Sequence, residues 1–146
     1  MELITDRTQA HVDLLNTLKA KGWDNLSDYE KNQWYGEAAK GAYNYTDLNR
    51  VESAVTEIAE ALGMVLSTKT DWGLWDVPTQ ADMDRYLINI EAVKNGCPSG
   101  EHFPDVPNRM GGLTFEVANK IEEILLLVNR SVDSIPRSGE IYCCEV

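Results

Sequence analysis

The sequence predicts an all-α domain, and three observations carry this prediction. Apolar residues recur at alternating spacings of three and four along several stretches, which is the period of an amphipathic helix. Residues typical of helix ends, such as threonine, serine and glycine, bracket these stretches. The chain has 146 residues, of which 43% are hydrophobic, enough to pack one domain. Five helices are predicted, at residues 8–21, 27–40, 46–62, 79–95 and 114–132.

The first two predicted helices form a hairpin. Thr8 is a suitable N-cap for the first helix. Ser27 and Glu30 have the spacing of a capping box, in which each side chain binds the other's main-chain amide, and this opens the second helix. We expect Trp23 and Trp34 to be core aromatics that clamp the hairpin.

The third and fifth predicted helices carry the most regular apolar seams. Because the two seams have the same period, the helices are natural partners for one another. The alternative is that each seam meets another copy of the chain. The seams are Leu48, Val51, Val55, Ile58 and Leu62 in the third helix, and Ala118, Ile121, Leu125, Val128 and Val132 in the fifth.

Two short motifs recur at nearly the same offset, which indicates an internal duplication. Asn49-Arg50-Val51-Glu52 returns as Asn119-Lys120-Ile121-Glu122, and Thr8-Gln9-Ala10 returns as Thr79-Gln80-Ala81. We therefore predict duplicated helical hairpins that form a four-helix core, with one extra helix in the first half. The chain is then one domain, 1–146, with halves at about 7–66 and 78–136, a linker at 67–77 and a short extended C-terminal tail at 137–146. A loop rich in proline and glycine, 96–112, replaces the extra helix in the second half.

The net charge of −11 is spread over both halves of the chain. Nucleic acid and anionic membranes repel a field of this sign, so neither is expected as a partner. No signal peptide is expected, since no basic segment followed by an apolar one opens the sequence. The longest apolar run, 124–128, is too short to cross a bilayer.

Three cysteines, two of them adjacent, favour free thiols in a reducing compartment.

The repeated asparagine and glutamate are the first candidate site. Residues at positions i and i+3 share one side of a helix, so Asn49 lies beside Glu52 and Asn119 beside Glu122. Helix capping explains the first pair but not the second, which sits deeper in its helix. We therefore predict that all four form polar contacts between the repeats. Catalysis by them is not expected, because no matched base or nucleophile is nearby.

A metal site is the second candidate, and the sequence gives it little support. Cys97 and His102 do not have a usual zinc spacing, and Cys143 and Cys144 are distant in sequence. No nucleophile motif and no glycine-rich phosphate loop is present either. We expect no metal, no cofactor and no enzymatic activity; a cell-wall hydrolase is the least supported function.

Two aromatic segments are candidate binding sites for a protein or a glycan. Trp72 and Trp75 lie in the polar linker, where they either face a partner or fold back over the helices. The second of these outcomes is favoured, because tryptophan burial contributes strongly to packing. Ile141 and Tyr142 in the tail either pack on the chain's own bundle or add an edge strand to a neighbour.

The chain also resembles a family of small proteins encoded in tailed phages and prophages near tail and baseplate genes. The residues that carry the resemblance are Arg7-Thr8-Gln9-Ala10, Ala20-Lys21-Gly22-Trp23, the segment 40–52, which ends in Asn44-Tyr45-Thr46-Asp47-Leu48-Asn49-Arg50-Val51-Glu52, and Ser138-Gly139-Glu140-Ile141-Tyr142.

The resemblance implies a virion structural protein, assembled in the host cytoplasm, that forms an oligomer and binds other tail or baseplate proteins. It supplies no catalytic residues. The alternative function is a carbohydrate-binding adaptor at the tail tip that contacts the host surface through Trp72 and Trp75.

Overall fold

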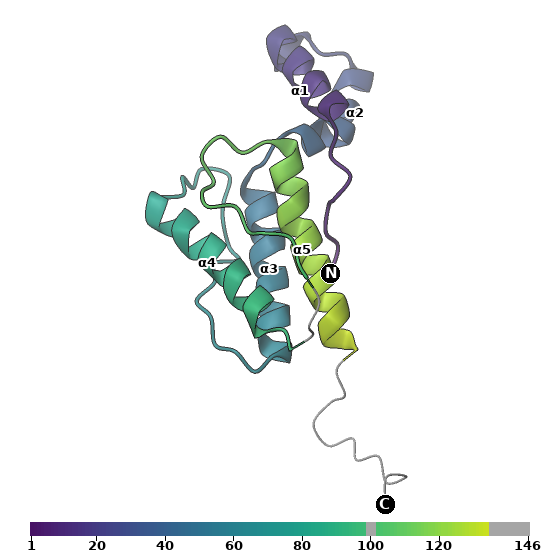
Figure 1. The fold of residues 1–146 in the computed structure, drawn as a ribbon. Helices are drawn as coiled ribbons and strands as arrows, with labels where there is room; N and C mark the ends of the chain where they lie inside the picture. Colours follow the sequence, from purple (N-terminus) through teal and green to yellow (C-terminus); the bar gives the residue numbers. More distant parts are fainter. Residues whose placement is uncertain (99–101, 135–146) are drawn as a thin grey trace, which may run out of the picture.

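The structure is a computed structural model that describes residues 1–98 and 102–134 (Figure 1). Throughout this part of the chain the regular structure is helical and contains no strand, which confirms the all-α prediction. The five α-helices are α1 (Gln9–Lys21), α2 (Asp28–Tyr35), α3 (Tyr45–Ala61), α4 (Gln80–Gly96) and α5 (Phe115–Asp133). Two 3₁₀ helices, η1 (Trp23–Asn25) and η2 (Glu37–Gly41), flank α2.

The main hydrophobic core lies between α3, α4 and α5, which pack on one another in pairs. The predicted seams of α3 and α5 face each other, with Val51 and Ile121 fully buried. Ile90 of α4 is also fully buried and belongs to the same core. Among the helices of the described residues, α3, α4 and α5 alone supply the main core, so the predicted four-helix core is not confirmed.

Residues 8–42, the N-terminal unit, form a smaller cluster of their own beyond the end of the bundle (Figure 1). Leu15, Leu18 and Leu26 are its buried centre. Gly41 brings η2 against α1 so closely that a Cβ at this position would lie 2.3 Å from the carbonyl oxygen of His11. Only glycine permits this approach, so the N-terminal unit depends on it.

Two local predictions for the N-terminal unit are wrong. The helix predicted at 27–40 ends at Tyr35, because Gly36 adopts φ −98° and ψ −106°, outside the helical region. Trp23 is 41% exposed and meets Trp34 edge to face at 5.8 Å, so it borders the cluster and does not fill it. Trp34 does pack against the cluster, as predicted.

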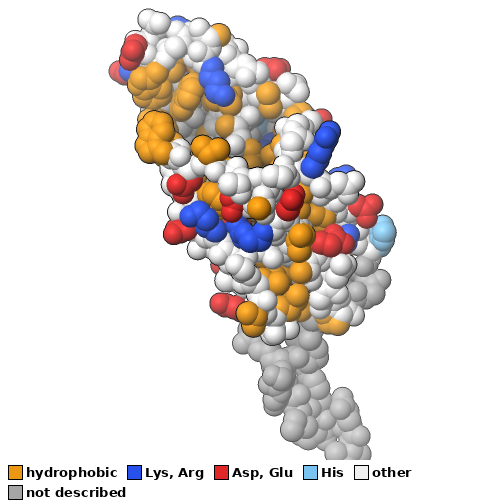
Figure 2. Space-filling model, turned by 90° about the vertical axis from the view of Figure 1, so that its left-hand side faces the viewer, with side chains coloured by type: hydrophobic (Ala, Val, Ile, Leu, Met, Phe, Trp, Pro, Cys, Tyr) orange, Lys and Arg blue, Asp and Glu red, His pale blue; other side chains and the backbone are white. Residues whose placement is uncertain are grey.

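Two extended segments lie along the outer sides of the bundle. Residues 1–7 run beside α5, and linker residues 67–72 run beside α3. Figure 2 shows one face of the molecule, on which hydrophobic side chains gather toward the upper end and charged side chains of both signs mix below them. The predicted tail at 137–146 lies outside the described residues.

Candidate functional site

A buried polar cluster, which we call the N-terminal clasp, fastens residues 4–7 to α5. It consists of Arg7, Asp47, Arg50, Asn119 and Glu122. The Asn119 carboxamide binds both main-chain groups of Arg7: its oxygen accepts from the amide at 3.1 Å and its nitrogen donates to the carbonyl at 2.9 Å. One turn later, Glu122 accepts a hydrogen bond from the Ile4 amide at 2.6 Å.

The charges of the N-terminal clasp balance. The Arg7 guanidinium lies 3.0 Å from Asp47 and 2.7 Å from Glu122. Arg50 bridges the same two carboxylates, at 2.5 Å and 2.6 Å. The Glu122 side chain has no exposed surface, so its charge depends on these partners. Burial disfavours the charged form of Arg50, but hydrogen bonds to Glu122 and Asp47 outweigh it and raise the pKa of this guanidinium.

A second cluster, the linker clasp, repeats this geometry on α3. It consists of Asn49, Glu52, Trp72 and Arg85. Asn49 binds the amide of Trp72 at 2.7 Å and its carbonyl at 2.9 Å. Glu52 accepts from the Lys69 amide at 3.2 Å and from the Trp72 indole nitrogen at 2.7 Å, and it also pairs with Arg85 of α4.

The two clasps follow one rule. In each, an asparagine on the helix binds the main-chain amide and carbonyl of one residue in the extended segment. A glutamate one turn further along the helix binds the amide of the residue that lies three positions earlier in that segment. Each extended segment therefore runs antiparallel to its helix. The segments themselves share a dipeptide, Thr5-Asp6 before Arg7 and Thr70-Asp71 before Trp72. The repeated Thr-Asp dipeptide is the sequence signal that could have predicted that both segments bind in the same way.

The four predicted polar residues lie at the centres of the clasps. Glu122 meets Arg50 of α3, and Glu52 meets Arg85 of α4, so both glutamates have a partner in the opposite predicted half. Asn119 also reaches the first half, at Arg7. Asn49 differs, since it binds the linker at Trp72.

The two candidate tryptophans have opposite environments. Trp72 is 5% exposed and packs in the main core, whereas Trp75 is 89% exposed. Asp76 fixes the turn that carries Trp75: its amide donates to the Gly73 carbonyl at 3.1 Å, and its carboxylate accepts from the Gly73 amide at 2.8 Å. The other two candidates, Ile141 and Tyr142, lie outside the described residues.

The metal candidates are not brought together within the described residues. Cys97 is buried at the end of α4, and His102 is exposed on the following loop. Across residues 1–98 and 102–134, no three His, Cys, Asp or Glu side chains are grouped so as to hold a metal ion. Cys143 and Cys144 lie outside this range.

None of the helices in the same range is long and apolar enough to cross a membrane.

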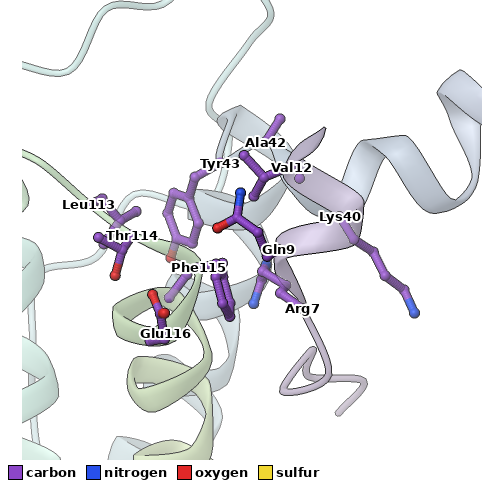
Figure 3. Close-up of a pocket in the computed structure, with 12 residues that line it drawn as sticks. Arg7, Gln9, Val12, Lys40, Ala42, Tyr43, Leu113, Thr114, Phe115 and Glu116 are labelled. Carbon is purple, nitrogen blue, oxygen red and sulfur yellow. The ribbon is translucent and has the colours of Figure 1, made fainter. Parts of the chain in front are cut away.

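Sequence reasoning missed two features near the clasps. The hydroxyl groups of Tyr43 and Tyr86 are hydrogen-bonded to each other, and burial raises the pKa of both phenols. A cavity of about 400 Å³ opens between the N-terminal unit and the start of α5 (Figure 3). Its lining residues include Arg7, Gln9, Lys40, Tyr43 and Phe115.

The comparisons with known proteins do not identify the chain. No protein-family model matches the sequence, and neither a curated protein nor a solved structure matches it. Each carboxylate in the clasps is paired with arginine and accepts a hydrogen bond from a main-chain amide, an arrangement that fastens one segment of the chain to another.

Proposed function

We propose that the chain is a non-enzymatic structural protein of a phage tail or baseplate, where it serves as an assembly or connector component. One observation carries this proposal. The segment 44–52, the most distinctive part of the family resemblance, supplies Asp47 and Arg50 to one clasp and Asn49 and Glu52 to the other. A motif whose polar atoms bind the chain's own segments supports a scaffold more than a catalyst.

We also propose that the two halves arose by duplication. The matched clasps on α3 and α5 support this idea, because an asparagine–glutamate pair holds an extended segment in the same way twice. In this proposal α1 and α4 are equivalent helices that now pack differently. The α4 helix lies in the main core, whereas α1 packs in the N-terminal unit.

The proposed location is the virion, with assembly in the host cytoplasm and with other tail or baseplate proteins as partners. The experiment is to place a short epitope tag on the chain in a phage or prophage that encodes it and to purify the particles by density gradient. We expect mass spectrometry to detect the tagged chain in particles and gold-labelled antibody to mark the tail region. Complete particles that lack the chain would refute the proposal.

A second experiment addresses the partners directly. Light scattering of the purified protein, alone and mixed with the products of neighbouring tail genes, should show complexes larger than a single chain. Binding to none of these proteins would contradict a connector role. A location of the gene away from all tail genes would also count against it.

A carbohydrate-binding adaptor is the second candidate function, and the exposed Trp75 indole is the observation that favours it. Burial removes Trp72 from any glycan-facing surface. A glycan array with wild type and Trp75→Ala tests this function. Equal signals from both proteins, or no signal from either, would eliminate it.

A further inference from the structure

Residues 1–7, which we call the N-terminal arm, join two parts of the molecule that otherwise meet loosely. The helices of the N-terminal unit pack on one another, and α3, α4 and α5 pack on one another. The cavity of about 400 Å³ lies between the two parts, with Val12 on one side and Phe115 on the other (Figure 3). Because protein interiors are close-packed, a hollow of this size at the junction leaves few contacts there to hold the N-terminal unit in place.

The arm and the N-terminal unit form one body. Asp6 of the arm is paired with Lys40 of η2 at 2.8 Å, and His11 of α1 is hydrogen-bonded to Glu37 of η2 at 2.7 Å. Residues 42–44 connect this body to α3, and the N-terminal clasp fastens it to α5. When the clasp opens, the body 1–42 can therefore pivot about residues 42–44.

The two halves of the chain already exchange their extended segments. The arm precedes Thr8-Gln9-Ala10 at the start of α1 but lies on α5, the clasp helix of the other half. The linker segment 67–72 precedes Thr79-Gln80-Ala81 at the start of α4 but lies on α3. Reciprocal exchange of this kind is the arrangement of a domain-swapped dimer, here completed within one chain.

Charge decides which segment the N-terminal clasp accepts. Without the arm, Asp47 and Glu122 share the single positive charge of Arg50, so the buried clasp has an excess of one negative charge. Arg7 supplies the missing positive charge to both carboxylates. At the equivalent position the linker segment has Trp72, whose indole donates one hydrogen bond to Glu52 and carries no charge. The clasp on α5 therefore requires an arm with arginine at this position.

We propose that the N-terminal arm of one copy also occupies the N-terminal clasp of a second copy, and that this exchange is reciprocal, so that two copies form a closed dimer. The arm of a second copy makes every contact that the arm makes within its own chain. Exchange competes with closure once the protein concentration approaches the effective concentration of the chain's own arm, roughly millimolar for a short connection. This inference rests on the proposed assembly role and deepens it by naming a second copy as a partner.

The test uses the purified full-length chain alone, so a negative result leaves the particle experiment above standing. Two variants each disable one side of the contact. Arg7→Glu places a carboxylate beside Asp47 and Glu122, which repels the arm but leaves the clasp intact. Asn119→Trp fills the place of the Arg7 main chain with an indole, which blocks the clasp but leaves the arm intact. Neither variant can close its own clasp.

The decisive measurement is sedimentation equilibrium of an equimolar mixture of these two variants. The intact arm of Asn119→Trp can reach the intact clasp of Arg7→Glu, so the mixture should form a 1:1 heterodimer. We expect this association to be at least about tenfold stronger than the self-association of either variant, the factor that corresponds to one lost hydrogen bond to a charged group. Exchange of the Arg7 amide in the Asn119→Trp copy, fast in that variant alone, should become slow in the mixture.

Lys120→Trp is the matched control for Asn119→Trp. Lys120 is the next residue of α5 and is exposed, so this variant keeps its arm in its own clasp and should not form the heterodimer. If circular dichroism shows that Arg7→Glu does not fold, Ile4→Pro takes its place, because proline removes the amide that donates to Glu122 and suits an extended main chain.

The wild type provides an independent measurement. Refolding from urea at roughly millimolar protein should give a dimer fraction, whereas refolding at about 100-fold lower concentration should give monomer, since each arm then meets its own clasp first. Four results would overturn the proposal. They are a mixture of folded variants that stays monomeric, self-association of Arg7→Glu as strong as that of the mixture, an equal heterodimer with Lys120→Trp, and a wild type that refolds only to monomer at the higher concentration.

Discussion

Asn119 binds both main-chain groups of Arg7, with its oxygen 3.1 Å from the amide nitrogen and its nitrogen 2.9 Å from the carbonyl oxygen. A carboxamide that makes this pair of contacts completes the hydrogen bonding of an extended residue without a neighbouring strand. Asn49 does the same for Trp72. Within residues 1–98 and 102–134, where the regular structure is helical, these two extended segments are therefore held by side chains and not by a sheet.

Removal of the buried charge at Glu122 should destabilise the fold strongly. Glu122→Gln keeps the shape of the side chain but leaves Arg7 and Arg50 with Asp47 as their only carboxylate in the clasp. Loss of one partner from a buried ion pair typically lowers the free energy of unfolding by about 3–5 kcal/mol. Urea denaturation measures the change.

The adjacent, exposed Glu123 provides the matched control for this prediction. Glu123→Gln should alter the free energy of unfolding by less than about 0.5 kcal/mol. Equal stability of the two variants would show that the N-terminal clasp does not stabilise the fold.

Each asparagine should protect only its own segment from hydrogen exchange. Asn119→Ala should speed amide exchange at Arg7, and Asn49→Ala should speed it at Trp72, each by about 10–100-fold, since loss of a hydrogen-bond partner for a buried group costs roughly 1–3 kcal/mol. Exchange measured by NMR for individual amides separates the two effects. If either substitution accelerates exchange at both residues alike, the clasps do not act independently.

Gly41 should be needed for the packing of the N-terminal unit. An alanine Cβ would lie 2.3 Å from the carbonyl oxygen of His11 and 2.9 Å from the Cα of Val12, so η2 must shift away from α1. Overpacking of this kind typically costs about 1–3 kcal/mol. Thermal unfolding followed by tryptophan fluorescence reports the loss, because Trp23 and Trp34 lie in this unit.

Gly111→Ala is the control for the glycine prediction. A Cβ at Gly111 has no atom within 4 Å, so this substitution should leave the melting temperature close to that of the wild type. A Gly41→Ala variant as stable as Gly111→Ala would contradict the close packing of η2 on α1.

The tyrosine pair should make stability fall in alkali. Burial raises the pKa of Tyr43 and Tyr86 above the ordinary value of 10.0, so the folded chain retains protons that the unfolded chain releases. Their contribution to stability is complete below pH 10 and is lost as the pH rises above it. Urea denaturation between pH 9 and about 12 should show a steeper loss for the wild type than for the variant Tyr43→Phe/Tyr86→Phe. Parallel curves would refute the prediction.

Local sequence patterns were sufficient to predict α3 and α5. Their apolar seams repeat at helical spacing, and two helices with seams of the same period can bury those seams against each other. The recurrence of Asn49 and Glu52 as Asn119 and Glu122 also predicts the residues at the centres of both clasps. Their arginine and main-chain partners were not predicted, because Arg7 and Arg85 approach them from segments distant in sequence.

Residues within a turn or two of one another are enough to specify the helical class, the helices of the main core and the asparagine–glutamate pairs on α3 and α5. Contacts between distant segments instead place α1 outside the core, bury Trp72 while Trp75 stays exposed, and bring arginines to the buried glutamates. These outcomes share one cause. Which extended segment lies against which helix depends on close packing and charge pairing between segments far apart in the chain, and no local period encodes these contacts.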